Sequence, residues 1–171
     1  RHNWRFWTEP QPNLSNRSVY VPRGRVVGGS SSINSMIAIR GNPQDYDAWA
    51  ACGLPSWGYE SLRPYFRKIE DATLVTSSRD PDRGYGGPIR LSYGTLRNPV
   101  SLAFIEGARS AGLPANDGFN GASQAGAGFY ELSIADGRRS GASKYLEQSK
   151  GRPNLTLLTD CRVRRLAMNG L

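Results

Sequence analysis

The sequence contains a single histidine, His2, in a chain of 171 residues. Histidine is the side chain used most often as a general base near neutral pH, so this chain is poorly supplied for acid–base catalysis. A Gly-x-Ser-x-Gly nucleophile motif and a cluster with metal-ligand spacing are also lacking. We therefore expect no catalytic base, no metal site and no complete active site within these residues.

Cysteine and long apolar runs are scarce as well. The spacing of the two cysteines, Cys52 and Cys161, matches neither a metal site nor a disulfide framework. We expect two small buried residues in a reducing compartment, with a single bridge between them as the alternative. No apolar run is long enough to span a membrane, and the first residues lack the apolar stretch of a secretory signal. These absences predict a cytoplasmic protein without a transmembrane segment, and they leave open a membrane association of a longer parent.

Positive charge is abundant, since the 22 Lys and Arg residues outnumber the 14 Asp and Glu residues and give a formal charge of +8. Such an excess is found in proteins that bind nucleic acid or membrane surfaces. It is also found in a basic domain whose positive charge is balanced by other parts of a longer protein. The basic residues are scattered, with short clusters at residues 138–139 and 162–165. This scatter favours the second interpretation and predicts no nucleic-acid partner.

Both ends of the chain suggest an internal fragment. The first residue is Arg1 rather than methionine, and the last are Asn169, Gly170 and Leu171. Asn-Gly after a strand-like run is a strong hairpin signal, because both central positions of that turn need positive φ. The strand that should return from this turn is absent, so we expect a piece of a longer protein.

Hydrophobic spacing and turn residues predict a mixed α/β fold without internal repeats. Asn42 and Pro43 are typical of a helix start, and Gly53 is typical of a helix end. The expected helices are a short one that begins at the serines of residues 30–32 and is closed by Arg40 and Gly41, then residues 42–53, 62–69, 98–112 and a helix capped by Ser140 that continues through residue 146. The expected strands are residues 89–93, 129–134, 155–159 and 163–168, with a turn at Asp136 and Gly137.

A doubled glycine before a serine run is the most unusual local feature. Gly28 and Gly29 allow a ligand to approach the backbone closely. Ser30 and Ser31 open the predicted helix, which Arg40 and Gly41 close, and its unpaired N–H groups would attract an anion. Asn34, one turn further, is placed to hydrogen-bond a ligand held there. The pattern predicts a phosphate-binding turn, although a tight strand-to-helix connection would use the same residues.

The same stretch resembles the first signature of a known family. It consists of Pro22-Arg23-Gly24-Arg25-Val26-Val27-Gly28-Gly29-Ser30-Ser31-Ser32-Ile33-Asn34-Ser35-Met36, then Arg40-Gly41 and Asp45-Tyr46-Asp47-Ala48-Trp49. This run is similar to the signature of the glucose–methanol–choline (GMC) oxidoreductases. Shorter echoes follow in the expected order at Trp57-Gly58-Tyr59, Asn120-Gly121, Arg139-Ser140, Tyr145-Leu146 and Arg152-Pro153-Asn154-Leu155. The variant resembles the choline-dehydrogenase-like branch.

The resemblance implies an FAD-dependent enzyme that oxidises the CH–OH group of a small alcohol by hydride transfer to the flavin and passes the electrons to an acceptor. It implies part of a Rossmann-like FAD domain together with part of a β-sheet substrate domain. The cofactor contacts carried over by position are Gly28, Gly29, Ser30, Ser31 and Asn34, with Ser35 and Met36 near the isoalloxazine ring and Val163 near the adenine.

Three departures from the family pattern refine these expectations. The amino-terminal GxGxxG turn and the carboxy-terminal catalytic histidine are absent, as an internal fragment requires. Some members bind FAD covalently through a histidine just before the signature asparagine. Ile33 occupies that position here, so non-covalent FAD is expected.

Within residues 1–171, the resemblance places a flavin-facing loop and helical cover at residues 1–71. It places a substrate-domain part at residues 72–150 and a return to the FAD domain at residues 151–171. The fragment alone is expected to be inactive. Two alternatives remain, an FAD-containing hydroxynitrile lyase of the same family and a non-catalytic basic binding module.

Overall fold

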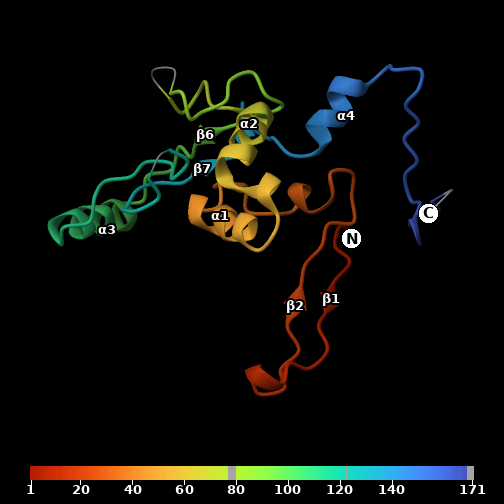
Figure 1. The fold of residues 1–171 in the computed structure, drawn as a ribbon, viewed down its shortest axis with the longest axis horizontal. Coiled ribbons are helices and arrows are strands. Elements are labelled where there is room, and N and C mark those ends of the chain that lie inside the picture. Colours follow the sequence, from red (N-terminus) through yellow and green to blue (C-terminus); the bar gives the residue numbers. More distant parts are fainter. Residues whose placement is uncertain (77–79, 122, 169–171) are drawn as a thin grey trace.

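Figure 1 shows the computed structural model of the chain, which describes residues 1–76, 80–121 and 123–168. A two-stranded arm near the amino terminus extends away from a central body of helices and short strands. Helix α3 (Pro99–Ser110) lies on one far side of this body, and the carboxy-terminal segment runs down the other. The molecule is thus a central body with extensions on several sides.

Helices and strands alternate irregularly along the chain. The other helices are α1 (Pro43–Ala51), α2 (Tyr59–Ile69) and α4 (Ser143–Ser149), with the short 3₁₀ helices η1 (Pro12–Leu14), η2 (Gly29–Ser32) and η3 (Pro55–Trp57). The strands are β1 (Phe6–Trp7), β2 (Tyr20–Val21), β3 (Ile37–Ala38), β4 (Glu70–Asp71), β5 (Ile89–Arg90), β6 (Ser92–Tyr93), β7 (Glu131–Leu132), β8 (Ile134–Ala135) and β9 (Arg138–Arg139). The mixed helix and sheet class is confirmed.

Helices α1 and α3 begin where the sequence predicts. The side chain of Asn42 accepts a hydrogen bond from the Gln44 N–H (3.0 Å), and that of Asn98 accepts one from the Val100 N–H (2.9 Å). A proline follows each cap, where its missing N–H would have had no intrahelical partner. Both starts are predictable because cap and proline act within a single turn.

Aromatic side chains join α1, η3 and α2. The Tyr46 ring lies 5.3 Å from that of Trp49, 6.2 Å from Tyr59 and 5.4 Å from Phe66 between centroids. Trp49 also contacts Trp57 at 6.0 Å. This cluster fixes the two helices against each other, so α1, η3 and α2 form one unit.

The main sheet has the strand order β3–β7–β6, and both pairings are antiparallel. Leu132 of β7 pairs with Ile37 on one side and with Ser92 on the other. Strands β4 and β5 form a separate parallel pair, and β8 and β9 form a hairpin. The hairpin turn has φ of 52° at Asp136 and 68° at Gly137, which confirms the predicted turn.

The predicted helix between the serines and Arg40-Gly41 is wrong, since only the 3₁₀ helix η2 (Gly29–Ser32) forms there. Met36 has a φ of 63°, a left-handed conformation that a helix cannot contain. Its N–H donates to the Asn34 side-chain oxygen (3.1 Å), and its carbonyl accepts a bond from the Ser133 N–H (2.7 Å). Residues 37 and 38 then enter β3. Contacts with Ser133, which is 97 positions away, therefore override the helical spacing.

The predicted strands also differ from the structure. Residues 89–93 and 129–134 are each divided, between β5 and β6 and between β7 and β8. Residues 155–159 and 163–168 form no strand. Within the described parts of the chain no ladder partner lies beside them, and a strand needs a neighbour to bond its backbone groups. The predicted Asn169–Gly170 turn lies outside the described residues.

Three individual residues correct earlier expectations. Ser140 does not cap α4, which begins at Ser143; it is buried, and its hydroxyl accepts a bond from the Arg90 N–H (2.9 Å). Cys52 and Cys161 are free and exposed rather than buried. The first of these cysteines lies at the end of α1 and the second in the exposed carboxy-terminal segment.

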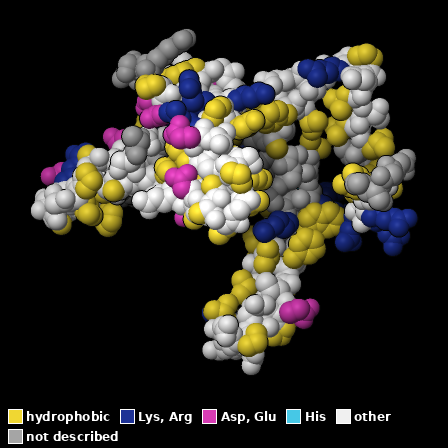
Figure 2. Space-filling model, viewed as in Figure 1, with side chains coloured by type: hydrophobic (Ala, Val, Ile, Leu, Met, Phe, Trp, Pro, Cys, Tyr) yellow, Lys and Arg dark blue, Asp and Glu magenta, His cyan; other side chains and the backbone are white. Residues whose placement is uncertain are grey.

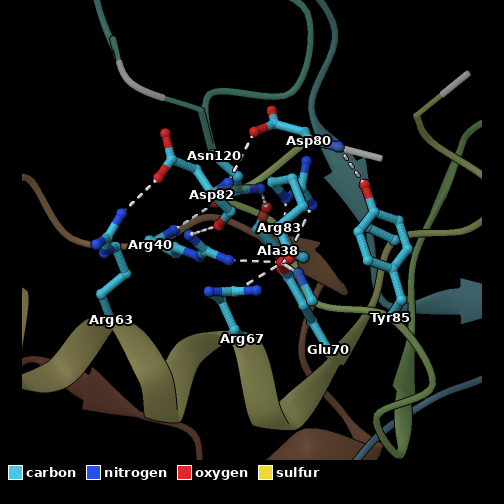
Figure 3. A network of polar contacts seen from close by, with 12 residues as sticks. Ala38, Arg40, Arg63, Arg67, Glu70, Asp80, Asp82, Arg83, Tyr85 and Asn120 are labelled. Carbon is cyan, nitrogen blue, oxygen red and sulfur yellow. Dashed lines mark hydrogen bonds and ion pairs between the residues drawn. The ribbon is translucent and has the colours of Figure 1, made fainter. Parts of the chain in front are cut away.

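The centre of the body is charged (Figure 3). Arg83, which is 4% exposed, donates two hydrogen bonds of 2.6 Å to the carboxylate of Glu131, which is 1% exposed. Glu70 accepts bonds from both Arg83 and Arg40. The buried apolar residues of the described chain are few and mostly small: Ala72, Leu91, Ala127 and Ala135. An ion network therefore takes the place of a large apolar core.

Much apolar surface remains uncovered. The chain exposes 12915 Å², whereas a compact monomer of 18.7 kDa exposes about 8,300 Å². Hydrophobic side chains spread over the arm and the body in Figure 2, and Trp7, Leu96 and Phe104 are among the large ones that are exposed. Apolar surface on this scale is typical of a face that contacts other protein.

Candidate functional site

Gly28 and Gly29 form a tight turn that requires glycine. Their φ angles are 88° and 58°, in the left-handed region that other residues adopt at a cost. The turn leads into η2, which has only four residues. Because η2 replaces the longer predicted helix, the turn offers individual backbone N–H groups rather than the dipole of a helix.

The serines of η2 bond the turn itself. The Ser31 hydroxyl donates to the Gly28 carbonyl (2.6 Å) and accepts from the Ala142 N–H (3.0 Å). The Ser30 hydroxyl accepts a bond from the Gly24 N–H (3.1 Å). These hydroxyls therefore hold the shape of the glycine turn from within.

The Gly28 N–H remains available to a ligand. No acceptor for it lies among the residues that the structure describes, and Gly28 lines a cavity of about 760 Å³. A Cβ built on Gly29 would meet no atom within 4 Å, so the outer side of the turn is open. The turn thus combines a free donor with unobstructed space.

The cavity joins two segments that are distant in the sequence. Trp4, Arg25 and Gly28 line it from the amino-terminal side, and Leu157 and Arg162 line it from the carboxy-terminal segment. The structure therefore brings the glycine turn and the residues next to the predicted adenine contact into one site.

Val163, the predicted adenine contact, does not line this cavity. Its side chain is 75% exposed, and its neighbour Arg162 faces the cavity instead. Arg162 was missed because an arginine in a basic run gives no sign from sequence alone of which surface it faces.

Asn34 is fixed by a residue that the sequence did not identify as part of the site. The Asn34 side-chain oxygen accepts bonds from Arg139 Nη1 (2.7 Å) and from the Met36 N–H (3.1 Å). Arg139 Nη1 also donates to the Asn34 carbonyl (2.7 Å). The Asn34 Nδ2 group has no partner among the described residues. Arg139 therefore leaves the amide of Asn34 presented as a donor.

Ser35 and Met36 follow directly and carry the chain from the turn into β3. Ser35 is exposed, while Met36 is partly buried. The Met36 carbonyl also accepts a bond from the Ser133 hydroxyl (3.1 Å). The unusual φ of Met36 is thus held by the sheet, and strained residues of this kind gather at functional sites.

A second cavity of about 760 Å³ lies beside α3 and contains none of the predicted site residues. It is lined in part by Tyr93, Arg97 and Phe129, and the Arg97 guanidinium lies 4.1 Å from the centre of the Phe129 ring. Burial and the nearby carboxylate of Glu131 raise the pKa of the Tyr93 phenol above its ordinary value.

No group of three or more His, Cys, Asp and Glu side chains in the described residues could hold a metal ion. None of the helices there is long and apolar enough to cross a membrane.

Known proteins resemble this chain over nearly all of its length. It is 40% identical to an oxygen-dependent choline dehydrogenase from Sinorhizobium fredii, over 98% of this chain and 30% of that protein. The structure of a pyridoxine 4-oxidase from Mesorbium loti superposes with a TM-score of 0.87 and 38% identity, over 99% of this chain and 34% of that one. The structure of a formate oxidase from Aspergillus oryzae superposes with a TM-score of 0.80 and 26% identity, over 99% of this chain and 30% of that one. That structure was described for the effect of a mutation on FAD modification.

The chain spans about a third of the length of these proteins. The family model described as GMC oxidoreductase matches residues 11–170. That range contains the glycine turn, Asn34, Arg139 and the segment beside the cavity. The family that the signature suggested is thereby confirmed, and the chain belongs to the GMC oxidoreductases.

Proposed function

We propose that this chain is part of an FAD-dependent oxidoreductase that acts on the CH–OH group of a small alcohol. One observation carries the proposal: a single cavity joins the Gly28 turn to the segment beside Val163. These are the two segments that the family resemblance assigns to FAD. The choline dehydrogenases among the relatives fit the same class of substrate.

The residues present fit a nucleotide cofactor. The free Gly28 N–H supplies a donor for a phosphate oxygen, and the open side of Gly29 leaves room for the cofactor backbone to approach. Asn34 presents its Nδ2 donors. When bound, the flavin supplies hydride acceptance. The residues of this chain bind and orient it, and such positioning is the usual contribution of the protein in cofactor enzymes.

The rest of the site belongs to other parts of the full-length protein. The proposed base is a histidine outside these residues, so the isolated chain has no activity of its own. We propose non-covalent FAD, because Ile33 stands where some family members carry the linking histidine. The proposed division places residues 1–71 against the flavin, 72–150 in the substrate domain and 151–171 back in the FAD domain.

The full-length protein tests this function directly. We expect the purified protein to carry FAD in a one-to-one ratio, and a primary alcohol such as choline to bleach its visible absorbance under anaerobic conditions. Acid precipitation should release the flavin into the supernatant if it is bound without a covalent link. A protein without flavin, or a flavin that no alcohol reduces, would contradict the proposal. Cyanohydrin cleavage without flavin reduction would identify a lyase instead.

Arg139 gives a sharper test of the site. We expect Arg139→Gln to weaken FAD binding about tenfold, because it removes two charge-assisted hydrogen bonds that orient Asn34. Titration of the flavin-free full-length protein with FAD measures the affinity. Arg138→Gln, at the preceding position of β9, is the matched control, and this variant should bind FAD as the wild type does.

A double-mutant cycle separates orientation from a general loss of charge. If Arg139 acts through Asn34, then Arg139→Gln and Asn34→Ala together should weaken binding little more than Asn34→Ala alone. Fully additive losses would show that the two residues act independently and would remove the orienting role.

A further inference from the structure

The side chain of Asn120 bonds the backbone at the end of β3 as a neighbouring strand would (Figure 3). Its Oδ1 atom accepts a hydrogen bond from the Arg40 N–H (2.7 Å), and its Nδ2 group donates to the Ala38 carbonyl (2.8 Å). These two backbone groups point to the same side of an extended chain, where a paired strand would meet them. One carboxamide therefore takes the place of a peptide unit in the ladder.

The donor and acceptor pattern of this contact requires an amide. A carboxamide offers one acceptor oxygen and two N–H donors, whereas an ionised aspartate offers acceptors only. The Arg40 N–H can only donate, so it faces the Asn120 oxygen. The Nδ2 group faces acceptors, the Ala38 carbonyl and the Glu131 carboxylate (3.1 Å to Oε2). The orientation of the amide is fixed by these partners.

Asn120 is itself held firmly. It is 4% exposed, and the Glu131 carboxylate that it contacts accepts two bonds from Arg83. The preceding residue, Phe119, has a φ of 62°, a left-handed conformation that a bulky residue adopts only at a cost. Such strain persists where the surrounding structure imposes it, and it gathers at functional sites. The loop after α3 thus presents a buried and well-fixed asparagine to β3.

Strand β3 is too short to hold its own position. It pairs with β7 over two residues only, far fewer than the usual five or six or so. At its start the Met36 carbonyl accepts bonds from the N–H and the hydroxyl of Ser133. At its end the bonds come from side chains, from Asn120 and from Gln124, whose Nε2 group donates to the Arg40 carbonyl (2.7 Å). The segment is therefore fastened at both ends by residues distant in the sequence.

We propose that Asn120, assisted by Gln124, is a positioning residue for the flavin. It fixes β3, and through β3 it sets the orientation of residues 34–36, which directly precede the strand. This inference rests on the proposed function, which places residues 34–36 against the cofactor. It adds that a loop with no described residue in the Gly28 cavity controls the alignment of flavin and substrate. Small displacements of groups that orient reactants can slow a reaction strongly.

Hydrogen exchange in the flavin-free full-length protein tests the contact without any activity. In Asn120→Ala the backbone amides of residues 36–41 should exchange about five- to tenfold faster than in the wild type, because the bonds to Ala38 and Arg40 are lost. Asn116→Ala is the matched control. Its Nδ2 group donates to the carbonyls of Ser123 (2.8 Å) and Ala125 (2.9 Å) in the same loop. That variant should loosen the loop and leave exchange at residues 36–41 unchanged.

Anaerobic reduction of the bound flavin by an alcohol gives the second readout. Asn120→Ala should lower the limiting rate constant of flavin reduction about tenfold, with the FAD content and the Kd for the alcohol close to those of the wild type. Asn116→Ala should reduce its flavin at the wild-type rate. A purely structural role would instead lower the Tm of both variants and leave the rate constant of the flavin-loaded fraction unchanged.

Gln124→Ala keeps the test decisive if Asn120→Ala does not fold. It removes one partly buried bond to Arg40 and should produce both changes at about two- to threefold. Wild-type exchange and reduction in Asn120→Ala, or in Gln124→Ala where only that variant folds, would overturn the positioning role. Equal changes in Asn116→Ala would do the same, and each of these results leaves the flavoprotein assignment intact. A wild type without flavin, or with a flavin that no alcohol reduces, would refute the proposed function and this inference with it.

Discussion

Replacing Arg83 with methionine in the full-length protein should lower the free energy of unfolding by about 3–5 kcal/mol. The substitution keeps an unbranched apolar stem but removes the only guanidinium that bonds both Glu70 and Glu131 in the described structure. Glu131 is 1% exposed, so its carboxylate would be left without solvent or a counter-charge. Chemical denaturation followed by circular dichroism measures the change.

The existing network explains why the loss should be so large. Burial by itself lowers the pKa of the Arg83 guanidinium, but hydrogen bonds to Glu131 and Glu70 outweigh burial and hold that pKa above its ordinary value. The network is also complete, since no buried side-chain nitrogen or oxygen of the described residues lacks a partner. Removing Arg83 therefore takes away the hydrogen bonds that it donates to Glu131 Oε1 and Glu70 Oε2.

Arg63→Gln is the matched control for this prediction. Arg63 bonds Asp82 (2.9 Å) and Glu60 (2.9 Å), but its side chain is 35% exposed, and exposed pairs contribute about 0–1 kcal/mol. If Arg83→Met cost no more than Arg63→Gln, the buried network would not be a principal source of stability.

Gly24→Ala should remove most of the bound FAD. A Cβ at this position would lie 2.1 Å from the Gly29 carbonyl oxygen and 2.3 Å from its carbon. Both are backbone atoms, so the clash cannot be relieved by rotating a side chain. Because Gly24 also bonds Ser30 through its N–H, the glycine turn itself must move.

Overpacking of this kind costs about 1–3 kcal/mol, and we expect at least a tenfold loss of FAD affinity as the Gly28 donor is displaced. Flavin content after purification and titration with FAD measure both effects. The control is Gly107→Ala in α3, where an added Cβ meets no atom within 4 Å. That change should leave the flavin unchanged and stabilise the helix by about 0.5–1 kcal/mol. Full flavin occupancy in Gly24→Ala would show that the turn is not part of the cofactor site.

Features encoded within one turn of chain were predictable from the sequence. The caps at Asn42 and Asn98 and the hairpin at Asp136 and Gly137 are specified by adjacent residues, and each lies where expected. The glycine pair was likewise identified, because few residue types other than glycine adopt the left-handed backbone conformation that the turn needs.

Features that depend on distant partners were not predictable. Met36 leaves the helical pattern because of Ser133, and Asn34 is held by Arg139, 105 positions away. The bond between Arg83 and Glu131 spans 48 positions. The strands expected at residues 155–159 and 163–168 are absent because a pattern of apolar residues cannot supply the neighbour that a ladder needs.

Two segments that are distant in the sequence meet at the glycine turn, and this limits how early the cavity between them can form during synthesis. Arg139 bonds Asn34 across 105 positions, and Arg162 reaches Trp4 from still further along the chain. During synthesis at about 5–20 residues per second, the amino-terminal half leaves the ribosome seconds before its partners exist. Closing so long a loop carries an entropic cost, so helix α1 and its cap should form early and the proposed cofactor site late. A nascent chain arrested before Arg139 would accordingly carry folded helices but not the proposed cofactor site.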